Sequence, residues 1–456
     1  MDFPQLLIKT KSPVEPKADW IKQGLNQHNC CFIGYISNAK ALQQQLNLNL
    51  DGELNQQAME QLVCAAIQRW GYKVNQYLFG DYNIVWFDEN EQHLGITASA
   101  RSSFSLFYTL QRQANDPIEV AFDLKKLHSE DNVLNPIHWL QQVSLGPLIG
   151  RHTYLNNIRR LQPGETIIWN MTEYKCCHQV KLESEQQLKF ADNALSSCFD
   201  NSPTICFEHQ QQEQQTSTLA LFNQLPQIAH HLGEPIHDAL LAHFDQQISQ
   251  CEHTWVKLDE SWFSGRLNVT QAPITGQKFD SKIIWQKSIL RDSLLKFRRK
   301  VSHRQDYLFT SFEAVSAEKN HDQLTFATWL DLHFVIPAWC QLYQRIANKY
   351  GKVIINPYIK AENALAMINK QQTSEKGFFN LEDESLCNVY DAMQRLFRNG
   401  EQATKKWFDL KPAVTAGFIK QREQYPRLVE QTSIAMLTFD YLAKFHNNHI
   451  DSEISV

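Results

Sequence analysis

The sequence predicts an α/β protein of two domains, with an α+β N-terminal half built on antiparallel strands and a largely helical α/β half after it. Three observations support this fold class. Short runs of β-branched and aromatic residues, separated by polar turns, dominate the chain to about residue 172. From Leu188 onward, apolar residues recur mostly at helical spacing. A length of 456 residues is enough for two domains that each bury a core.

The N-terminal half begins with an extension, residues 1–28, in which Lys, Pro and polar residues are mixed. The first apolar run, Cys30–Ile36, predicts a buried strand. Apolar residues between Met59 and Trp70 recur at helical spacing, and Gly71 follows where a helix commonly ends. One helix is therefore predicted in this stretch.

A series of strands follows this helix. Three β-rich runs separated by polar turns predict an antiparallel meander: Tyr77–Trp86, Leu94–Ala98 and Ser105–Leu110. The Pro163-Gly164 turn leads into a further strand, Thr166–Trp169. The pattern changes at 172–187, where we place the domain boundary. The first domain is predicted to span 29–172 and the second 188–456.

The second half carries apolar residues at helical spacing in four groups. They are Leu219, Phe222, Leu225 and Ile228; Leu240, Leu241, Phe244 and Ile248; Trp285, Ile289, Leu290 and Leu294; and Phe326, Leu330 and Phe334. Pro226 disfavours a helix in the first group. The aromatic residues of 326–344 fit a core helix better than a partner groove, and the Gln-rich piece 210–215 fits a solvated segment.

Composition excludes several classes of protein. The net charge is −5, and the one dense basic cluster, Arg298–Lys300, is short, so nucleic acid is not an expected partner. No run reaches about 18 uncharged apolar residues, so no membrane span is expected. The N-terminus lacks the pattern of a secretory signal, which predicts a cytoplasmic protein. The 10 cysteines include no Cys-x-x-Cys pair and indicate reduced, structural thiols.

The placement of the glycines excludes the common nucleotide-binding loops. The 16 glycines are never adjacent or one residue apart, and none lies between Gly164 and Gly233. Loops that wrap a phosphate with backbone N–H groups depend on clustered glycines. Neither a Walker loop nor a Gly-x-Gly-x-x-Gly turn is present.

The order of these segments resembles the glutamine-dependent asparagine synthetases and their relatives, including lactam-forming synthetases, over about 29–360. The stretches that carry the resemblance are Cys30–Gly34, Trp70-Gly71, Gly80–Tyr82 with Asp88, Ala100–Tyr108 and Asn157–Gly164. The resemblance implies an Ntn-hydrolase-like antiparallel β-sandwich with helices for 29–172. It implies an α/β synthetase domain like the adenine nucleotide hydrolases for 188–456.

Cys30 stands where the family has its N-terminal nucleophile. That chemistry uses the α-amine of the cysteine as the general base, so it requires removal of residues 1–29. An internal cysteine has no such amine. The family's Asn-Gly-Glu-Ile-Tyr-Asn segment has only a weak counterpart in Asp51–Asn55. We therefore predict an inactive glutaminase domain with Cys30 as a buried structural thiol.

The second domain departs from the family at the loop that holds the pyrophosphate of ATP. Relatives carry Ser-Gly-Gly-x-Asp-Ser-Ser in this place, with backbone N–H groups around the diphosphate. The matching residues are Gln212, Glu213, Gln214, Gln215, Thr216, Ser217 and Thr218. Side chains replace the glycines, and the Glu213 carboxylate repels polyphosphate. A different polar site made by Glu208, His209 and Glu213 remains an alternative.

Two further family motifs are partly kept. Asp259 and Glu260 match an acidic pair that helps to hold magnesium in relatives, although two acids after a strand also serve as a helix N-cap and first turn. The segment Val353–Lys360 keeps the family's Pro and aromatic residue but has lost its charged positions. His230, His231, His446 and His449 are expected to be solvated surface residues, because no third ligand has suitable spacing.

Two functions of different classes follow from the resemblance. The first is a pseudoenzyme without a cofactor, which acts as a scaffold, regulatory or peptide-binding subunit. Its expected partners are an active homologue or a peptide substrate, and a homodimer is also an expected state. The alternative is a divergent ATP- and Mg-dependent amide ligase, of the asparagine synthase or lactam/lasso-peptide cyclase type, that forms an acyl-adenylate. Lys257, Arg266 and Lys360 would then act beside Asp259 and Glu260.

Overall fold

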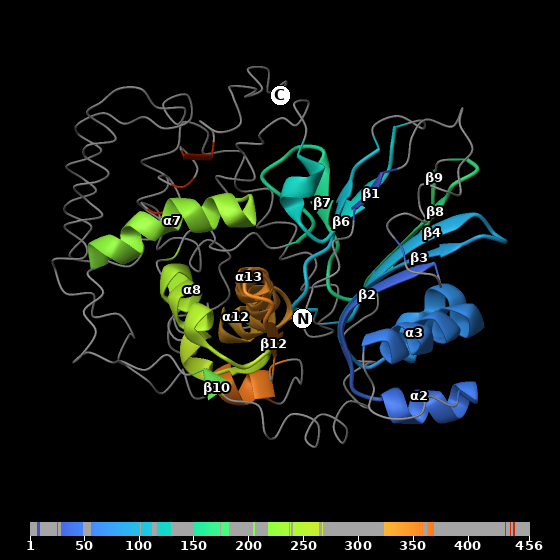
Figure 1. The fold of residues 1–456 in the computed structure, drawn as a ribbon, viewed down its shortest axis with the longest axis horizontal. Helices are drawn as coiled ribbons and strands as arrows, with labels where there is room; N and C mark the ends of the chain where they lie inside the picture. Colours follow the sequence, from blue (N-terminus) through green and yellow to red (C-terminus); the bar gives the residue numbers. More distant parts are fainter. Residues whose placement is uncertain are drawn as a thin grey trace.

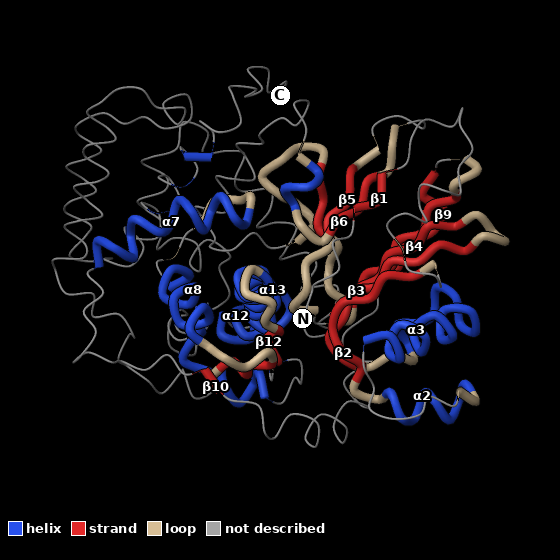
Figure 2. Tube along the Cα trace, in the orientation of Figure 1, coloured by secondary structure: helices blue, strands red, loops and turns tan. Residues whose placement is uncertain are grey.

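The computed structural model places three β-sheets and their helices (Figures 1 and 2). It describes residues 7–9, 25, 29–48, 56–100, 102–111, 116–128, 150–173, 175–181, 204–205, 218–236, 238, 240–263, 267, 323–356, 358, 363–368, 434, 438 and 441–442. No helix in these ranges combines the length and apolar character needed to cross a membrane.

A five-stranded antiparallel sheet with the order β2-β3-β4-β8-β9 forms the middle layer of the N-terminal half. Its strands are β2 (Cys30–Ile36), β3 (Gly80–Asp88), β4 (His93–Ala98), β8 (Glu165–Asn170) and β9 (Lys175–Lys181). Helices α2 (Ala39–Leu46) and α3 (Gln56–Trp70) cover one face, where Phe32, Leu62 and Tyr82 are buried together. The predicted first strand and the helix that ends before Gly71 are confirmed.

A four-stranded antiparallel sheet with the order β1-β6-β5-β7 covers the other face. Its strands are β1 (Leu7–Lys9), β5 (Phe107–Thr109), β6 (Glu119–Ala121) and β7 (Ile158–Arg160). Apolar residues of both sheets, including Val85, Ile96 and Val120, form the core between them. The result is a sandwich of two antiparallel sheets with helices on one outer face.

The third predicted strand does not continue the meander, so this part of the prediction is wrong. β5 pairs with β6 and β7 in the second sheet instead of with β4. The segment before β5 carries the chain between the sheets, and its Ser102 and Ser103 are fully buried. Asp81 and Asn83 of β3 bind this segment, because Asp81 accepts the Ser103 N–H at 2.8 Å and Asn83 Nδ2 donates to the Phe104 carbonyl at 2.9 Å. Buried polar partners on β3 thus replace a tight hairpin.

Part of the predicted extension and part of the predicted domain boundary belong to these sheets. β1 lies within residues 1–28, pairs with β6 and buries Ile8 completely in the core between the sheets. β9 extends the five-stranded sheet to Lys181, beyond the predicted domain end at 172.

The C-terminal half is built on a parallel sheet with the order β10-β11-β12. Its strands are β10 (Thr204–Ile205), β11 (Trp255–Leu258) and β12 (Val353–Ile355). Helices α7 (Thr218–Leu232), α8 (Leu240–Gln250), α12 (Gln323–Leu330) and α13 (Ile336–Asn348) contribute to one core, and a π-helical turn, Asp331–Val335, joins the last two. The predicted helix at 285–294 lies outside the described residues.

Within the described residues, helices form at three of the four groups with helical apolar spacing. α7 contains Pro226 within its span and still buries Leu225 and Ile228. In α12 and α13, Phe326 and Trp339 are almost fully buried, which confirms the prediction of a core helix in this stretch. The aromatic rings of Trp262 and Tyr343 pack edge to face at 5.8 Å in the same core.

Candidate functional site

Cys30 begins β2 and is 1% exposed, with its side chain on the face of the sheet that α2 and α3 cover. A hydrogen bond with Cys64 of α3, together with burial, raises the pKa of the Cys30 thiol well above its ordinary value. Cys30 is therefore a protonated thiol with a peptide N–H, whereas a nucleophile of this kind requires a thiolate and a free amine.

The residues on either side of Cys30 are also built into the fold. Cys31 faces the core between the sheets, and burial raises the pKa of its thiol to about 12. Upstream of Cys30, β1 contributes Ile8 to the same core. Cleavage before Cys30 would remove this strand from the four-stranded sheet.

The predicted nucleotide site is only partly described. Gln212, Glu213, Gln214, Gln215, Thr216 and Ser217 lie outside the described residues, and Thr218 begins α7. Glu208, His209, Arg266, Pro357, Lys360, His446 and His449 also lie outside them. In the sequence, residues 212–218 follow β10 and end at the first residue of α7.

Asp259 and Glu260 follow the carboxyl end of β11 and are partly exposed. Glu260 begins a 3₁₀ turn, and the Asp259 carbonyl accepts the Trp262 N–H at 3.3 Å. Tyr358 follows the neighbouring strand β12, and its pKa is raised by burial and by the charges of these two carboxylates. Within the described ranges no three His, Cys, Asp or Glu side chains form a group suited to a metal ion.

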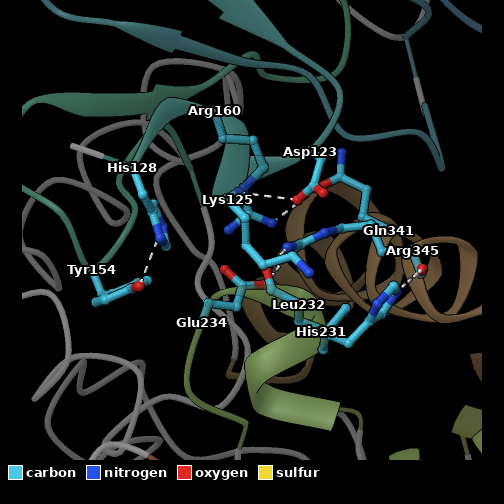
Figure 3. Close-up of polar contacts among 10 residues, drawn as sticks. All are labelled: Asp123, Lys125, His128, Tyr154, Arg160, His231, Leu232, Glu234, Gln341 and Arg345. Carbon is cyan, nitrogen blue, oxygen red and sulfur yellow. Dashed lines mark hydrogen bonds and ion pairs between the residues drawn. The ribbon is translucent and has the colours of Figure 1, made fainter. Parts of the chain in front are cut away.

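A cluster of polar contacts lies where the sandwich meets the helices of the C-terminal half (Figure 3). Arg345 of α13 donates from Nη1 to Glu234 Oε1 and from Nη2 to the Leu232 carbonyl at the end of α7. Its guanidinium also lies 5.1 Å from the ring centre of Phe107 on β5. One buried side chain thus joins α13, the end of α7 and the second sheet of the sandwich.

A second link lies beside the first. Arg160 of β7 donates from Nη1 to Gln341 Oε1 at 3.0 Å, and Gln341 Nε2 donates to the Ser102 carbonyl at 3.1 Å. All three residues are buried, and burial lowers the pKa of Arg160. Burial of an arginine and an amide at this boundary means that the two halves are held by specific polar contacts as well as by apolar packing.

Two histidines and one tyrosine also belong to the cluster: His128, His231 and Tyr154. The position of His231 corrects the sequence analysis. His231 is half-buried, and its Nε2 lies 3.3 Å from the Arg345 carbonyl, so it is not the solvated surface residue that we predicted. Burial lowers the pKa of His231, and the neutral ring donates to that carbonyl. Across the cluster, Tyr154 and His128 approach each other at 3.4 Å. His230 is exposed, as expected.

The sequence analysis did not identify Arg160, Glu234, Gln341 or Arg345 as a group. Arg345 and Gln341 lie on a helix whose every residue from Ile336 to Ala347 is buried, which is an unusual environment for such side chains. A charged residue inside an apolar helical pattern was the available signal, but nothing in one sequence pairs it with Glu234 more than a hundred residues away.

Comparison with known proteins adds little to these observations. No protein-family model matches the chain, and the search of curated proteins found no match. Among solved structures, it shows a distant similarity to the glutamine phosphoribosylpyrophosphate amidotransferase from B. subtilis complexed with ADP and GMP, at 15% identity and a TM-score of 0.23. The similarity covers 33% of this chain and 28% of that chain.

Proposed function

We propose that this chain is an asparagine-synthetase-like protein that has lost glutaminase and adenylating chemistry. It acts as a scaffold, regulatory or peptide-binding subunit in an amide-forming pathway. The state of Cys30 carries the proposal. Its thiol is buried and hydrogen-bonded to Cys64, and its backbone nitrogen belongs to a peptide bond. The burial of Ile8 in β1 supports it further, since processing before Cys30 would remove part of the core.

The reactivity of Cys30 tests the loss of glutaminase. Exposed Cys176 and Cys177 serve as internal controls on the same chain. We expect iodoacetamide to alkylate Cys30 on the order of 100-fold more slowly than these two, because thiolate and access both decide the rate. A diazo-ketone analogue of glutamine should leave Cys30 unmodified, as judged by peptide mass spectrometry. Rapid and selective modification of Cys30 by the analogue would contradict the proposal.

Adenylation is tested separately by titrating the full chain with Mg-ATP in a calorimeter and measuring pyrophosphate release, with and without glutamine and aspartate. We expect neither heat nor pyrophosphate, because side chains replace the glycines at 212–218 and no clustered glycines stand elsewhere. Stoichiometric pyrophosphate release would overturn this part of the proposal.

One observation favours the alternative, a divergent ATP-dependent amide ligase. Asp259 and Glu260 follow β11, Tyr358 follows β12, and the two strands are parallel neighbours. Their carboxyl ends therefore bring acidic and phenolic groups to the edge where α/β sheets bind ligands. If this site works, the Asp259→Asn and Glu260→Gln double variant should abolish any Mg-ATP-dependent release of pyrophosphate while keeping the unfolding midpoint of the wild type.

A further inference from the structure

Asp81 is a completely buried carboxyl group on β3, at the boundary between the sandwich and α13. Its Oδ1 accepts the Ser103 N–H at 2.8 Å, and its Oδ2 accepts the Ser103 hydroxyl. No ion pair of the described residues includes Asp81. A buried carboxylate without a cation is costly, so the neutral form is favoured in the closed structure.

Among the described residues, the groups that face Asp81 from the neighbouring elements do not supply a positive charge. Tyr35 comes from β2 and Cys340 comes from α13. Burial raises the pKa of the Tyr35 hydroxyl and of the Cys340 thiol well above their ordinary values. Ser102 and Ser103 contribute hydroxyl groups from the segment before β5. All four are uncharged near neutral pH, so within the described part of the chain a proton on Asp81 itself is what removes the charge.

The turn that Asp81 holds is also a docking point for α13. The Ser102 carbonyl accepts from Gln341 Nε2, and the same Gln341 side chain binds Arg160 of β7. Cys340, the neighbour of Gln341 on α13, lies near enough to Asp81 for an ionised Asp81 to raise the pKa of its thiol. Any rearrangement of the Asp81 contacts therefore reaches α13 through the hydrogen bond between Gln341 and the Ser102 carbonyl.

We propose that the protonation of Asp81 controls the contact between the two halves. The neutral carboxyl group keeps the Ser102-Ser103 turn packed against α13, and its ionisation loosens this contact. We call Asp81 and the Ser102-Ser103 turn the joint. The joint is independent of the proposed loss of enzymatic chemistry, so either can fail without the other. Ionisation places an unpaired charge in the boundary, and opening relieves it by admitting water.

The direction of the pH effect follows from the proton that each state binds. Burial raises the pKa of Asp81 from 3.8 to about 7, although the bonds from Ser103 act in the opposite direction. Between these two values the closed state keeps a proton that the opened state has lost. Opening therefore becomes easier by at most about tenfold for each pH unit in this window, and is independent of Asp81 above it.

Hydrogen–deuterium exchange of the full chain at about pH 5 and about pH 7.5 tests the joint, with rates corrected for the intrinsic effect of pH on exchange. We expect amides of 102–104 and of the 338–346 stretch of α13 to exchange at least about tenfold faster at the higher pH. Asp81→Asn should abolish this difference. The matched control is Asp245→Asn, because Asp245 is also buried but is paired with Lys349 and lies outside the boundary. Its variant should keep the difference.

A second variant separates the joint from general destabilisation. Gln341→Ala removes the link between α13 and the Ser102 carbonyl but leaves the Asp81 contacts with Ser103 in place. We expect the pH response to persist in 102–104 and to fall by about tenfold in α13. The proposal would be overturned if the amides of 102–104 and 338–346 in the wild type were equally protected from exchange at both pH values. It would also be overturned if the pH response survived in Asp81→Asn.

Discussion

Replacing Arg345 with Met should lower the free energy of unfolding by about 3–5 kcal/mol, because it leaves the Glu234 carboxylate buried and unpaired. Glu234 is 1% exposed, and its Oε2 already accepts no hydrogen bond from the described residues. The substitution also removes the donor to the Leu232 carbonyl and the contact with Phe107. Urea unfolding followed by circular dichroism measures the loss as a shift in the midpoint.

Two controls identify the cause of this loss. Lys349→Met removes one partner of Asp245 near the end of the same helix, where the lysine side chain is 40% exposed and the Tyr350 hydroxyl still donates to Asp245 at 3.0 Å, and should cost no more than about 1 kcal/mol. The double variant Arg345→Met with Glu234→Gln removes the unpaired charge and should recover a large part of the stability. If the double variant is as unstable as Arg345→Met alone, the burial of charge is not the cause.

Gly34→Ala should destabilise the sandwich by about 3 kcal/mol or more. Gly34 has φ +119, and an added Cβ would lie 2.1 Å from the Asp81 carbonyl oxygen and 2.7 Å from the Tyr82 Cα. These are backbone atoms of the paired strand β3, so they cannot move without breaking the β2–β3 ladder. Thermal and urea unfolding of the variant measure the effect.

Gly71→Ala is the matched control for this prediction. Gly71 has φ +54, and an added Cβ would meet nothing within 4 Å. This variant therefore carries the left-handed backbone strain, about 1–2 kcal/mol, without the collision. Equal losses in the two variants would show that the close approach of β2 and β3 contributes nothing.

Local patterns predicted the first strand, α3, the helices α7, α8 and α12 of the second half and the buried character of Cys30, since each depends on residues close in sequence. Pairing between distant segments was not predictable in the same way. β5 has the apolar composition of a further hairpin strand, but Asp81 and Asn83 bind the segment before it and direct it to the other sheet.

The boundary cluster could not be derived from one sequence for the same reason. Arg345, Gln341 and Arg160 each look like an isolated polar residue, and their function as contacts arises only when α13 packs against the sandwich. The error on His231 has this origin too, because its partner is a backbone carbonyl of α13, which leaves no pattern in the sequence.

The pairing of β1 with β6 sets the order in which the chain can reach its native fold. Leu7–Lys9 meets Glu119–Ala121, more than a hundred residues further along the polypeptide. At a synthesis rate of about 5–20 residues per second, the partner strand follows after several seconds at least. Through that interval Leu7–Lys9 has no partner strand, so the burial of Ile8 waits for the synthesis of β6.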